Sequence, residues 1–354
     1  MQYHLGIRSQ QGFVLVAVLW ILVIMVLAAT AFSLWVDRVR DQAFMRQQQV
    51  GAYQQSTDIL TKILYTYMTG IKTSEGIAWP SGDHSAPALG VQFDSLDDFM
   101  AGAAPKVNVT AAGFMRMDGG VLDTGYGLRI MIQDHAGLIG TSFLSDQQVF
   151  DNIAKSSGIK VNGARLKDTL YDYQDADSQR KLQGAESHDY RQQGLPPPIN
   201  GYLRSPLQLR SVMGWGDALS FYDDAWILRV FRTEGAAAIN VNTASEDALR
   251  LVLGNEDKIN TLLSVRESKR YDRLSDLARF VDGAEDISLS VLPSAGFRFW
   301  WWHEGDTTAR VYDVQFSPLD SGAKAWYFNW TARVTLPNDL AKSTAIEIDH
   351  PFFH

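Results

Sequence analysis

The feature that most constrains the fold is an apolar run from Phe13 to Val36, which contains no charged residue. At 1.5 Å of rise per residue, roughly 24 residues form a helix about 36 Å long. The hydrocarbon core of a bilayer is about 30 Å thick, so a helix of this length crosses it with some tilt. The sequence therefore predicts one transmembrane helix near the N-terminus.

A short polar leader, residues 1–12, precedes the apolar run and ends with Gly12 directly before Phe13. A secretory signal peptide has a shorter apolar region, and its small-residue cleavage site follows that region. Here the small residue comes first, so cleavage between Gly12 and Phe13 would leave the apolar helix as the new N-terminus. Two interpretations stay open from this stretch alone: cleavage at this bond, and an uncleaved membrane anchor.

The leader and the run resemble the class III signal of type IV pilins and type II secretion pseudopilins. In that family a prepilin peptidase cuts after glycine and methylates the new terminal residue, which implies processing at Gly12 and Phe13. Most members carry glutamate at the fifth mature position, where its carboxylate neutralises the terminal amine of a neighbouring subunit. The fifth residue here is Ala17. The K-type minor pseudopilins lack this glutamate, and the resemblance implies that Ala17 marks a tip subunit.

The helical pattern continues past the apolar run. Apolar residues recur at spacings of three and four as far as Tyr67, with Arg, Gln and Asp between them. We expect one helix over residues 13–68 that is apolar all round in its first half and amphipathic in its second. The amphipathic half would then pack its apolar stripe on a sheet, as in pilin-like subunits.

Alternation of apolar and polar residues predicts strands in two separate parts of the chain. One candidate is residues 127–134, and four more lie near the C-terminus, at residues 297–305, 309–316, 325–337 and 345–350. Helical patterns dominate between them. We therefore expect an α+β fold, in which a pilin-like long N-terminal helix packs on a small antiparallel sheet and a mostly α-helical domain is inserted. The predicted organisation is a leader (1–12), the long helix (13–68), the first part of the β region (69–140), the helical insert (141–292) and a C-terminal β region that completes the sheet (293–354).

The most specific stretch is residues 172–190, which places five carboxylates around a glycine turn: Asp172, Asp175, Asp177, Glu186 and Asp189. Crowded carboxylates repel one another, and a calcium ion with oxygen ligands relieves that repulsion. The spacing is not that of an EF-hand loop. From the residues alone, a solvated acidic loop and a calcium site both stay open.

The same stretch resembles the K-type pseudopilin signature, an Asp-aromatic-x-Asp-x-Asp run followed by Gly-Ala-Glu and a tyrosine. The matching residues are Asp172, Tyr173, Asp175, Asp177, Gly184, Ala185, Glu186 and Tyr190. Members of that family bind calcium, so the resemblance implies Asp175, Asp177 and Glu186 as ligands, with Asp172 and Asp189 behind them. The family usually has tryptophan at position 173 and an aliphatic residue at position 174, where this chain has Tyr173 and Gln174.

Two further motifs border the predicted insert. Asp134 and Gly137 resemble the family's Asp-x-x-Gly segment, at which the chain leaves the sheet. Residues 240–244, Asn-Val-Asn-Thr-Ala, resemble a structural motif of the same insert. Thr243 and Glu246 have the spacing of a capping box, which predicts that Thr243 caps the following helix.

This region is also similar to a helix-hairpin-helix module, and some such modules bind DNA. Phosphate contacts require basic residues beside the backbone amides of the hairpin. Residues 237–290 contain seven basic and ten acidic residues, 7 − 10 = −3, within a chain of net charge −8. We therefore expect no nucleic-acid partner, and a DNA-uptake role is the least favoured alternative.

No catalytic arrangement stands out in the sequence. The seven histidines are scattered, and there is no His-Glu-x-x-His, Gly-x-Ser-x-Gly or phosphate-loop motif. Cysteine is absent, which excludes disulfides and thiolate chemistry. We expect no enzyme activity. The three consecutive residues Trp300, Trp301 and Trp302 leave two interpretations open, an exposed contact surface and buried core.

Taken together, the resemblance implies a K-type minor pseudopilin at the tip of the periplasmic pseudopilus of type II secretion, where it would initiate assembly. The implied partners are the I-type and J-type minor pseudopilins, the major pseudopilin, prepilin peptidase and the inner membrane. We expect a single pass through the bacterial inner membrane with the C-terminal domain in the periplasm, an orientation taken from the resemblance because the flanking charges do not decide it. The alternative is a membrane-anchored periplasmic binding or scaffold protein of another pathway.

Overall fold

The computed structural model divides the chain into two compact units, residues 1–57 and residues 58–354. It describes residues 11–78, 91–92, 97, 100, 106–107, 113–125, 127–142, 144–233, 238–277, 289–317 and 325–348. The predicted leader therefore lies outside the described residues, apart from its last two. For residues 11–14, which include Gly12 and Phe13, only the helical backbone is described.

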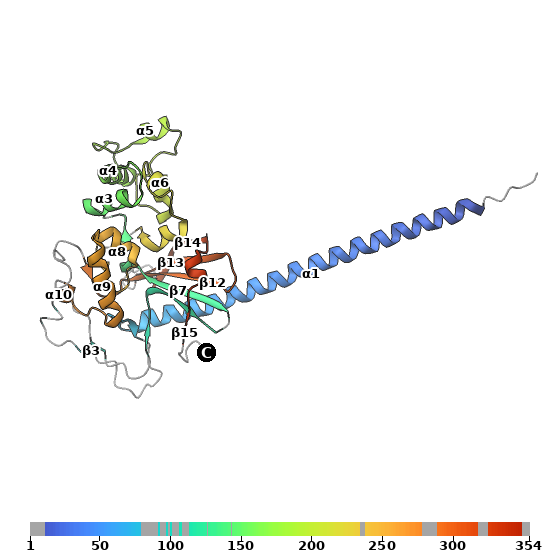
Figure 1. Ribbon diagram of the computed structural model, residues 1–354, viewed down its shortest axis with the longest axis horizontal. Helices are drawn as coiled ribbons and strands as arrows, with labels where there is room; N and C mark the ends of the chain where they lie inside the picture. Colours follow the sequence, from blue (N-terminus) through green and yellow to red (C-terminus); the bar gives the residue numbers. More distant parts are fainter. Residues whose placement is uncertain are drawn as a thin grey trace, which may run out of the picture. The chain divides into compact units, whose positions relative to one another are not determined.

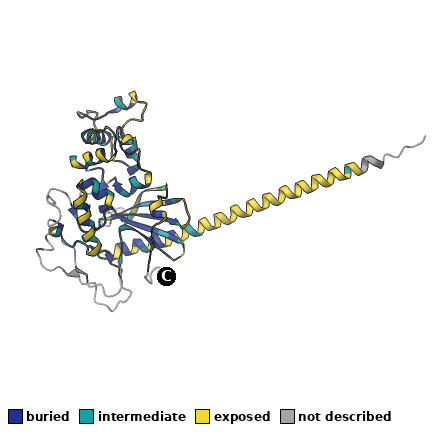
Figure 2. Cartoon of the chain, in the orientation of Figure 1, coloured by how far each residue is buried: buried dark blue, intermediate teal, exposed yellow. Residues whose placement is uncertain are grey.

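The predicted long helix is confirmed as α1, which runs from Gln11 to Thr69 (Figure 1). Nearly all of α1 from Leu15 to Val50 is exposed (Figure 2), and its side chains are almost all apolar as far as Val36. Mean hydropathy reaches 2.8 over an 18-residue window, none of which is buried. By length and composition, α1 can cross a bilayer.

The last turns of α1 belong to the second unit and bury an apolar stripe. The buried side chains recur at spacings of one, three and four: Ile59, Leu60, Ile63, Leu64 and Tyr67. The ring of Tyr67 stacks on Phe316, with centroids 4.3 Å apart, and lies 5.2 Å from the ring of Phe297. Phe297 and Phe316 are sheet residues, so the amphipathic part packs on the sheet as predicted.

The main sheet has six strands in the order β14-β13-β12-β7-β6-β15. Their bounds are β6 Asp118–Asp123, β7 Leu128–Asp134, β12 Gly296–His303, β13 Thr308–Phe316, β14 Trp326–Thr335 and β15 Ile346–Glu347. Strands β14 to β6 are antiparallel, and β15 adds to β6 in parallel. The predicted α+β class is therefore confirmed, and the early strand β7 pairs with the late strand β12.

The described residues also form four smaller ladders. Strands β1 (Lys72–Thr73), β2 (Gly76–Ala78) and β5 (Phe114–Met115) form one, and β3 (Val91–Gln92) with β4 (Lys106–Val107) forms another. The other two are parallel pairs, β8 (Ile139–Gly140) with β9 (Phe231–Arg232) and β10 (Ile239–Asn240) with β11 (Leu289–Ser290).

Most short helices lie between β8 and β11, as the sequence predicts. They are α3 Gln147–Ser156, α4 Gly163–Gln174, α5 Ser187–Gln192, η2 Pro206–Ser211, α6 Trp215–Ala218, α7 Asp224–Val230, α8 Glu246–Leu253, α9 Glu256–Ser268 and α10 Leu274–Leu277. Outside this group lie η1 (His135–Gly137) and α11 (Asn338–Ala341). The helical core centres on Trp215, whose ring lies against Phe150 and Phe231 and whose Nε1 donates to the Leu166 carbonyl at 2.8 Å.

The three consecutive tryptophans of β12 are core residues. Trp300, Trp301 and Trp302 are 0%, 5% and 1% exposed, so the interpretation as a contact surface is wrong. Trp300 and Trp302 pack with Leu228 of α7 on one face of the sheet. Both faces of this strand are covered, which explains why the sequence of β12 is almost continuously apolar.

The two motifs that border the insert pack directly on each other. Asp134 ends β7 and is fully buried; its Oδ2 accepts hydrogen bonds from Asn240 Nδ2 at 3.1 Å and from Thr243 Oγ1 at 2.9 Å. A Cβ added to Gly137 would lie 2.7 Å from the Thr243 carbonyl oxygen, so only glycine permits this approach. The predicted capping role of Thr243 is wrong, because its hydroxyl is bound by Asp134. Ser245 caps α8 instead and accepts from the Ala248 amide.

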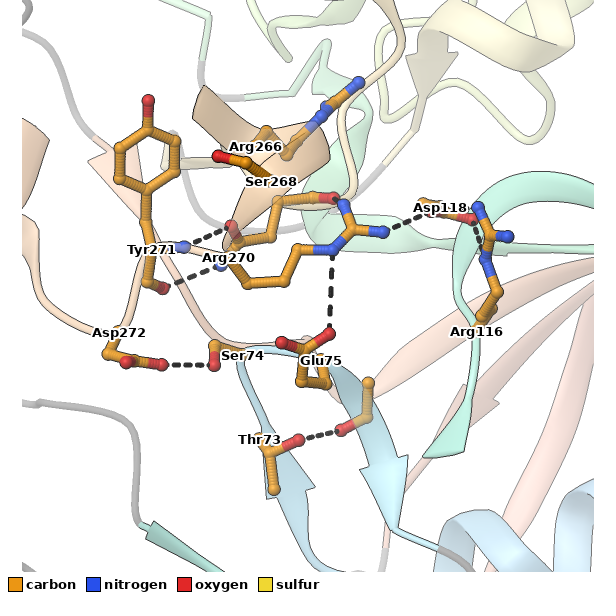
Figure 3. A network of polar contacts seen from close by, with 12 residues as sticks. Thr73, Ser74, Glu75, Arg116, Asp118, Arg266, Ser268, Arg270, Tyr271 and Asp272 are labelled. Carbon is orange, nitrogen blue, oxygen red and sulfur yellow. Dashed lines mark hydrogen bonds and ion pairs between the residues drawn. The ribbon is translucent and has the colours of Figure 1, made fainter. Parts of the chain in front are cut away.

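A second polar network joins the insert to the first strands (Figure 3). Arg270 donates to Asp118 at 2.7 Å and to the Asn242 carbonyl at 2.8 Å, and Asn242 accepts from the Tyr271 amide at 2.9 Å. Burial acts to raise the pKa of Asp118, but its bonds to Arg116 and Arg270 outweigh burial and lower it. The second asparagine of the Asn-x-Asn motif therefore binds protein backbone and has a structural role.

Candidate metal centre

The acidic stretch folds as the end of one helix, a loop and the start of another. Helix α4 begins after Asn162, whose side chain accepts from the Arg165 amide, and ends at Gln174, with Asp175 as its C-cap residue. Helix α5 begins after Glu186. Asp172 therefore lies on the last turn of α4, while Asp175 and Glu186 are the residues that flank the loop.

The structure brings together three of the five predicted ligands. Asp172, Asp175 and Glu186 each offer one carboxylate oxygen, and these oxygens all lie within 4.8 Å of one another. Asp172 is completely buried and Glu186 is 7% exposed, whereas Asp175 is half-buried. Asp172, which the resemblance ranks behind the others, is the most deeply buried member of the group.

The remaining two predicted ligands make other bonds. Asp177 Oδ1 accepts from the Gln179 amide at 2.7 Å, which closes a turn of the loop. Asp189 Oδ2 accepts from the Glu186 amide at 2.9 Å, and its Oδ1 accepts from Arg180 at 3.2 Å. Asp189 thus positions the backbone of Glu186.

Several oxygens of the three-carboxylate group lack protein hydrogen bonds. Asp175 Oδ1 and both carboxylate oxygens of Glu186 are buried and have no partner of normal geometry. Asp172 accepts from the Lys181 amide at 3.1 and 3.3 Å. Buried oxygens without donors are rare in folded proteins because leaving them unsatisfied is costly. A hard divalent cation satisfies such oxygens, so the residues present fit a calcium ion.

The raised pKa values of two of these carboxyl groups also favour a bound cation. Burial is the main cause that raises the pKa of Glu186, and the charges of Asp172 and Asp175 raise it further. Burial also raises the pKa of Asp172, to which the Asp175 charge adds. Like charges that are held together out of water disfavour their own ionisation. A bound cation reverses this effect.

The other signature residues shape the loop. A Cβ added to Gly184 would lie 1.9 Å from Asp172 Oδ2, so glycine is needed for the loop to reach the carboxylate. Tyr190 is fully buried, its hydroxyl accepts from the Met213 amide at 2.8 Å, and burial raises its pKa to about 12. Tyr173 is buried beside it, with ring centroids 5.9 Å apart, so the departure from tryptophan keeps an aromatic core residue.

Sequence reasoning missed Lys181 at this site. Its amide binds Asp172, and its Nζ lies 3.4 Å from Asp175 Oδ2. The sequence contains a signal for this contact, because Lys181 and Arg180 are the two basic residues between the acidic residues Asp177 and Glu186. Lys181 supplies one positive charge to a group of three carboxylates.

Comparison with known proteins bears on this region. Residues 137–220, which contain the whole acidic loop, match the family model described as type II secretion system (T2SS), protein K. No curated protein sequence gives a significant match. A solved structure, a chain from the GspK-GspI-GspJ complex of the enterotoxigenic Escherichia coli type 2 secretion system, is similar to this chain with 14% identity and a TM-score of 0.44. The match covers 63% of this chain and 83% of that one.

Proposed function

Because residues 137–220 match T2SS protein K, which confirms the resemblance to the K-type pseudopilins, we propose that this chain is a minor pseudopilin at the tip of a type II secretion pseudopilus. The single observation that carries the proposal is that the matched segment contains the acidic loop and its three converging carboxylates. The matched family is a component of a secretion system; the absence of enzyme activity stays a prediction.

The proposal includes a membrane anchor, which α1 supports, and processing of the leader, which rests on the resemblance stated above. Its apolar surface fits a single-pass membrane helix. In this proposal, the helix lies in the bacterial inner membrane and residues 58–354 lie in the periplasm. Prepilin peptidase cleaves after Gly12 and methylates Phe13, so that the mature chain starts at the membrane-spanning run.

The tip position is supported by the chemistry of the helix start. Ala17 offers no carboxylate, and no other residue from Phe13 to Val36 carries one. A terminal amine buried among apolar helices needs a counter-charge, and this chain cannot provide one to a neighbouring subunit. A subunit that begins the fibre does not need to provide this counter-charge. The I-type and J-type minor pseudopilins are the proposed direct partners, and the major pseudopilin follows them.

A calcium ion at the three-carboxylate group completes the proposed tip subunit. Asp172, Asp175 and Glu186 would hold it, and calcium takes further oxygens from backbone carbonyls and water. The ion would join the end of α4 to the start of α5 and so fix the loop between them. Its contribution is structural.

Mass analysis of the membrane-extracted chain, with and without prepilin peptidase, tests the assignment. We expect a mature chain that begins at N-methylated Phe13 only when the peptidase is present. An intact Met1 in both strains would contradict the pseudopilin assignment and favour an anchored scaffold protein. Co-purification of the I-type and J-type subunits with the mature chain then tests the proposed partners, with Ala17→Glu as the variant that alters the tip-specific position.

A further inference from the structure

The sequence contains two Asn-Gly dipeptides, Asn162-Gly163 and Asn200-Gly201, and both lie in the helical insert. This dipeptide is chemically reactive, because glycine has no Cβ to keep its amide nitrogen away from the side-chain carbonyl carbon of the preceding asparagine. Attack by that nitrogen closes a five-membered ring and releases ammonia. In a folded chain the reaction depends on how freely the two groups can approach each other, and the two dipeptides differ in this respect.

The first dipeptide is fixed at the start of α4. Oδ1 of Asn162 accepts from the Arg165 amide at 2.7 Å, and the Asn162 backbone carbonyl accepts from the Leu166 amide at 3.3 Å. Gly163 is buried, and a Cβ added to it would lie 2.6 Å from the Asp151 amide nitrogen. Ring closure at Asn162 would therefore break the helix cap and displace closely packed backbone.

The second dipeptide lies in an exposed bend before η2. Asn200 is exposed and Gly201 is half-buried. Among the described residues, neither the side chain of Asn200 nor the amide of Gly201 has a hydrogen-bond partner. A Cβ added to Gly201 would meet only the Ile199 carbonyl oxygen, at 3.8 Å. The side chain of Asn200 can therefore turn toward the Gly201 nitrogen without breaking a contact of the fold.

The backbone of Asn200 explains why an asparagine stands in this reactive position. Asn200 has a φ of 49° and is the one non-glycine residue with positive φ in the part of the chain that the structure describes. Asparagine and aspartate adopt this conformation at lower cost than other side chains do. The Asn200 amide also donates to the Tyr173 carbonyl at 3.1 Å, which attaches the bend to the last turn of α4.

We propose that Asn200 is a site of spontaneous deamidation and that the fold protects Asn162 from the same reaction. The Gly201 nitrogen attacks Cγ of Asn200 and loses its proton; the new carbon–nitrogen bond replaces the bond to the side-chain nitrogen, which leaves as ammonia. Water then opens the resulting succinimide at either of its two carbonyls, to give aspartate or isoaspartate. Either product adds one negative charge to a bend that is attached to Tyr173, the neighbour of Asp172 in the candidate metal centre. This inference does not depend on the secretion role proposed above.

Peptide mapping by mass spectrometry tests the proposal on the full chain in nanodiscs, incubated at mildly alkaline pH. We expect Asn200 to deamidate roughly tenfold faster than Asn162, because ring closure at Asn162 must also break its cap. Both aspartate and isoaspartate should form at position 200. In the denatured chain, where cap and packing are lost, the two asparagines should react at similar rates.

Gly201→Ala shields the attacking nitrogen with a Cβ that the bend accommodates, and it should slow deamidation at Asn200 severalfold. Gly51→Ala, at a position of α1 where a Cβ also meets nothing within 4 Å, is the matched control and should leave the rate unchanged. Equal rates at the two asparagines of the folded chain, or an unchanged rate in Gly201→Ala, would overturn the proposal. Aspartate without isoaspartate would mean direct hydrolysis and would overturn the attack by Gly201.

Discussion

The hydroxyl of Thr243 donates a 2.9 Å hydrogen bond to Oδ2 of Asp134, although the two residues lie 109 positions apart. Asp134 ends β7 at the point where the chain leaves the sheet, and Thr243 lies in the Asn-x-Asn-Thr-Ala segment of the insert. The bond therefore joins the two motifs that the sequence analysis treats separately.

Removing either partner should destabilise the fold, and the loss should be larger for Asp134 than for Thr243. Asp134→Ala leaves several buried donors without an acceptor, and we expect a loss of about 3–5 kcal/mol. Thr243→Val keeps the shape and removes one donor, with an expected loss of about 1–2 kcal/mol. Denaturant unfolding measures both. Thr261→Val, on the exposed side of α9, is the control and should change stability little; a loss at Thr261 equal to that at Thr243 would contradict the role of the Asp134 bond.

The acidic loop gives a prediction about calcium. Because Glu186 and Asp175 carry buried oxygens without hydrogen-bond partners of normal geometry, Glu186→Ala and Asp175→Ala should abolish the rise in melting temperature on calcium addition. Asp177→Ala should keep most of that rise, since Asp177 lies outside the three-carboxylate group. Melting curves with and without calcium, in chelator-treated buffer, measure the difference. Equal loss in the Asp177 and Glu186 variants would place the ion elsewhere in the loop.

Lys181 should compete with calcium for Asp175. Its Nζ lies 3.4 Å from Asp175 Oδ2, and both side chains are partly exposed, so the pair is screened by solvent. Lys181→Met removes the competing charge and should tighten calcium binding by roughly threefold, about 0.6 kcal/mol. Calorimetric titration with calcium measures the affinity. Lys155→Met, on α3, is the matched control; weaker calcium binding by the Lys181 variant would mean that the lysine supports the ion.

Without a cation, the raised pKa of Glu186 should favour the folded state increasingly as the pH falls. The pKa of Glu186 is raised in the folded state, mainly by burial, so the folded chain binds its proton more tightly than the unfolded chain does. The destabilisation is fully present above the folded pKa and is relieved as the pH falls through it towards the ordinary value of 4.5. The difference in unfolding free energy between the parent chain and Glu186→Gln should shrink over that window. A constant difference in chelator would contradict the raised pKa.

Two glycines near the loop should respond differently to alanine. Gly184→Ala places a Cβ 1.9 Å from Asp172 Oδ2, so the loop or the carboxylate must move, and we expect a loss of about 1–3 kcal/mol with weaker calcium binding. Gly201→Ala meets only the Ile199 carbonyl oxygen, at 3.8 Å, and should be nearly neutral. Melting temperature and calcium affinity of the two variants check this contrast.

The sequence predicts the elements whose pattern is local. The long helix, β7 and the four C-terminal strands follow from periodicity, and the helical character of residues 147–277 follows from caps and spacing. The carboxylates of the candidate site follow from the resemblance to a signature. These features depend on short segments, which explains why they can be predicted without tertiary contacts.

Other features depend on contacts between distant residues. Thr243 has the spacing of a cap, but a buried carboxylate from β7 binds its hydroxyl. Asp172 belongs to the three-carboxylate group because Gly184 lets the loop come close to its carboxylate. The spacing of these residues in the sequence does not reveal this approach. The tryptophans of β12 lack alternation because both faces of the strand are covered, and β15 joins β6 in parallel through a connection that no local signal marks.

The pairing of β7 with β12 also has a consequence for the order of folding. Asp134 lies opposite Phe297, so the whole insert must be synthesised before the middle of the sheet can close. Non-local pairing of this kind is slow, because a long loop must close before its contacts stabilise it. During that interval β7 presents an open strand edge, which invites pairing with other chains. A chaperone that shields this edge until the last strands are synthesised would therefore protect the chain from such pairing.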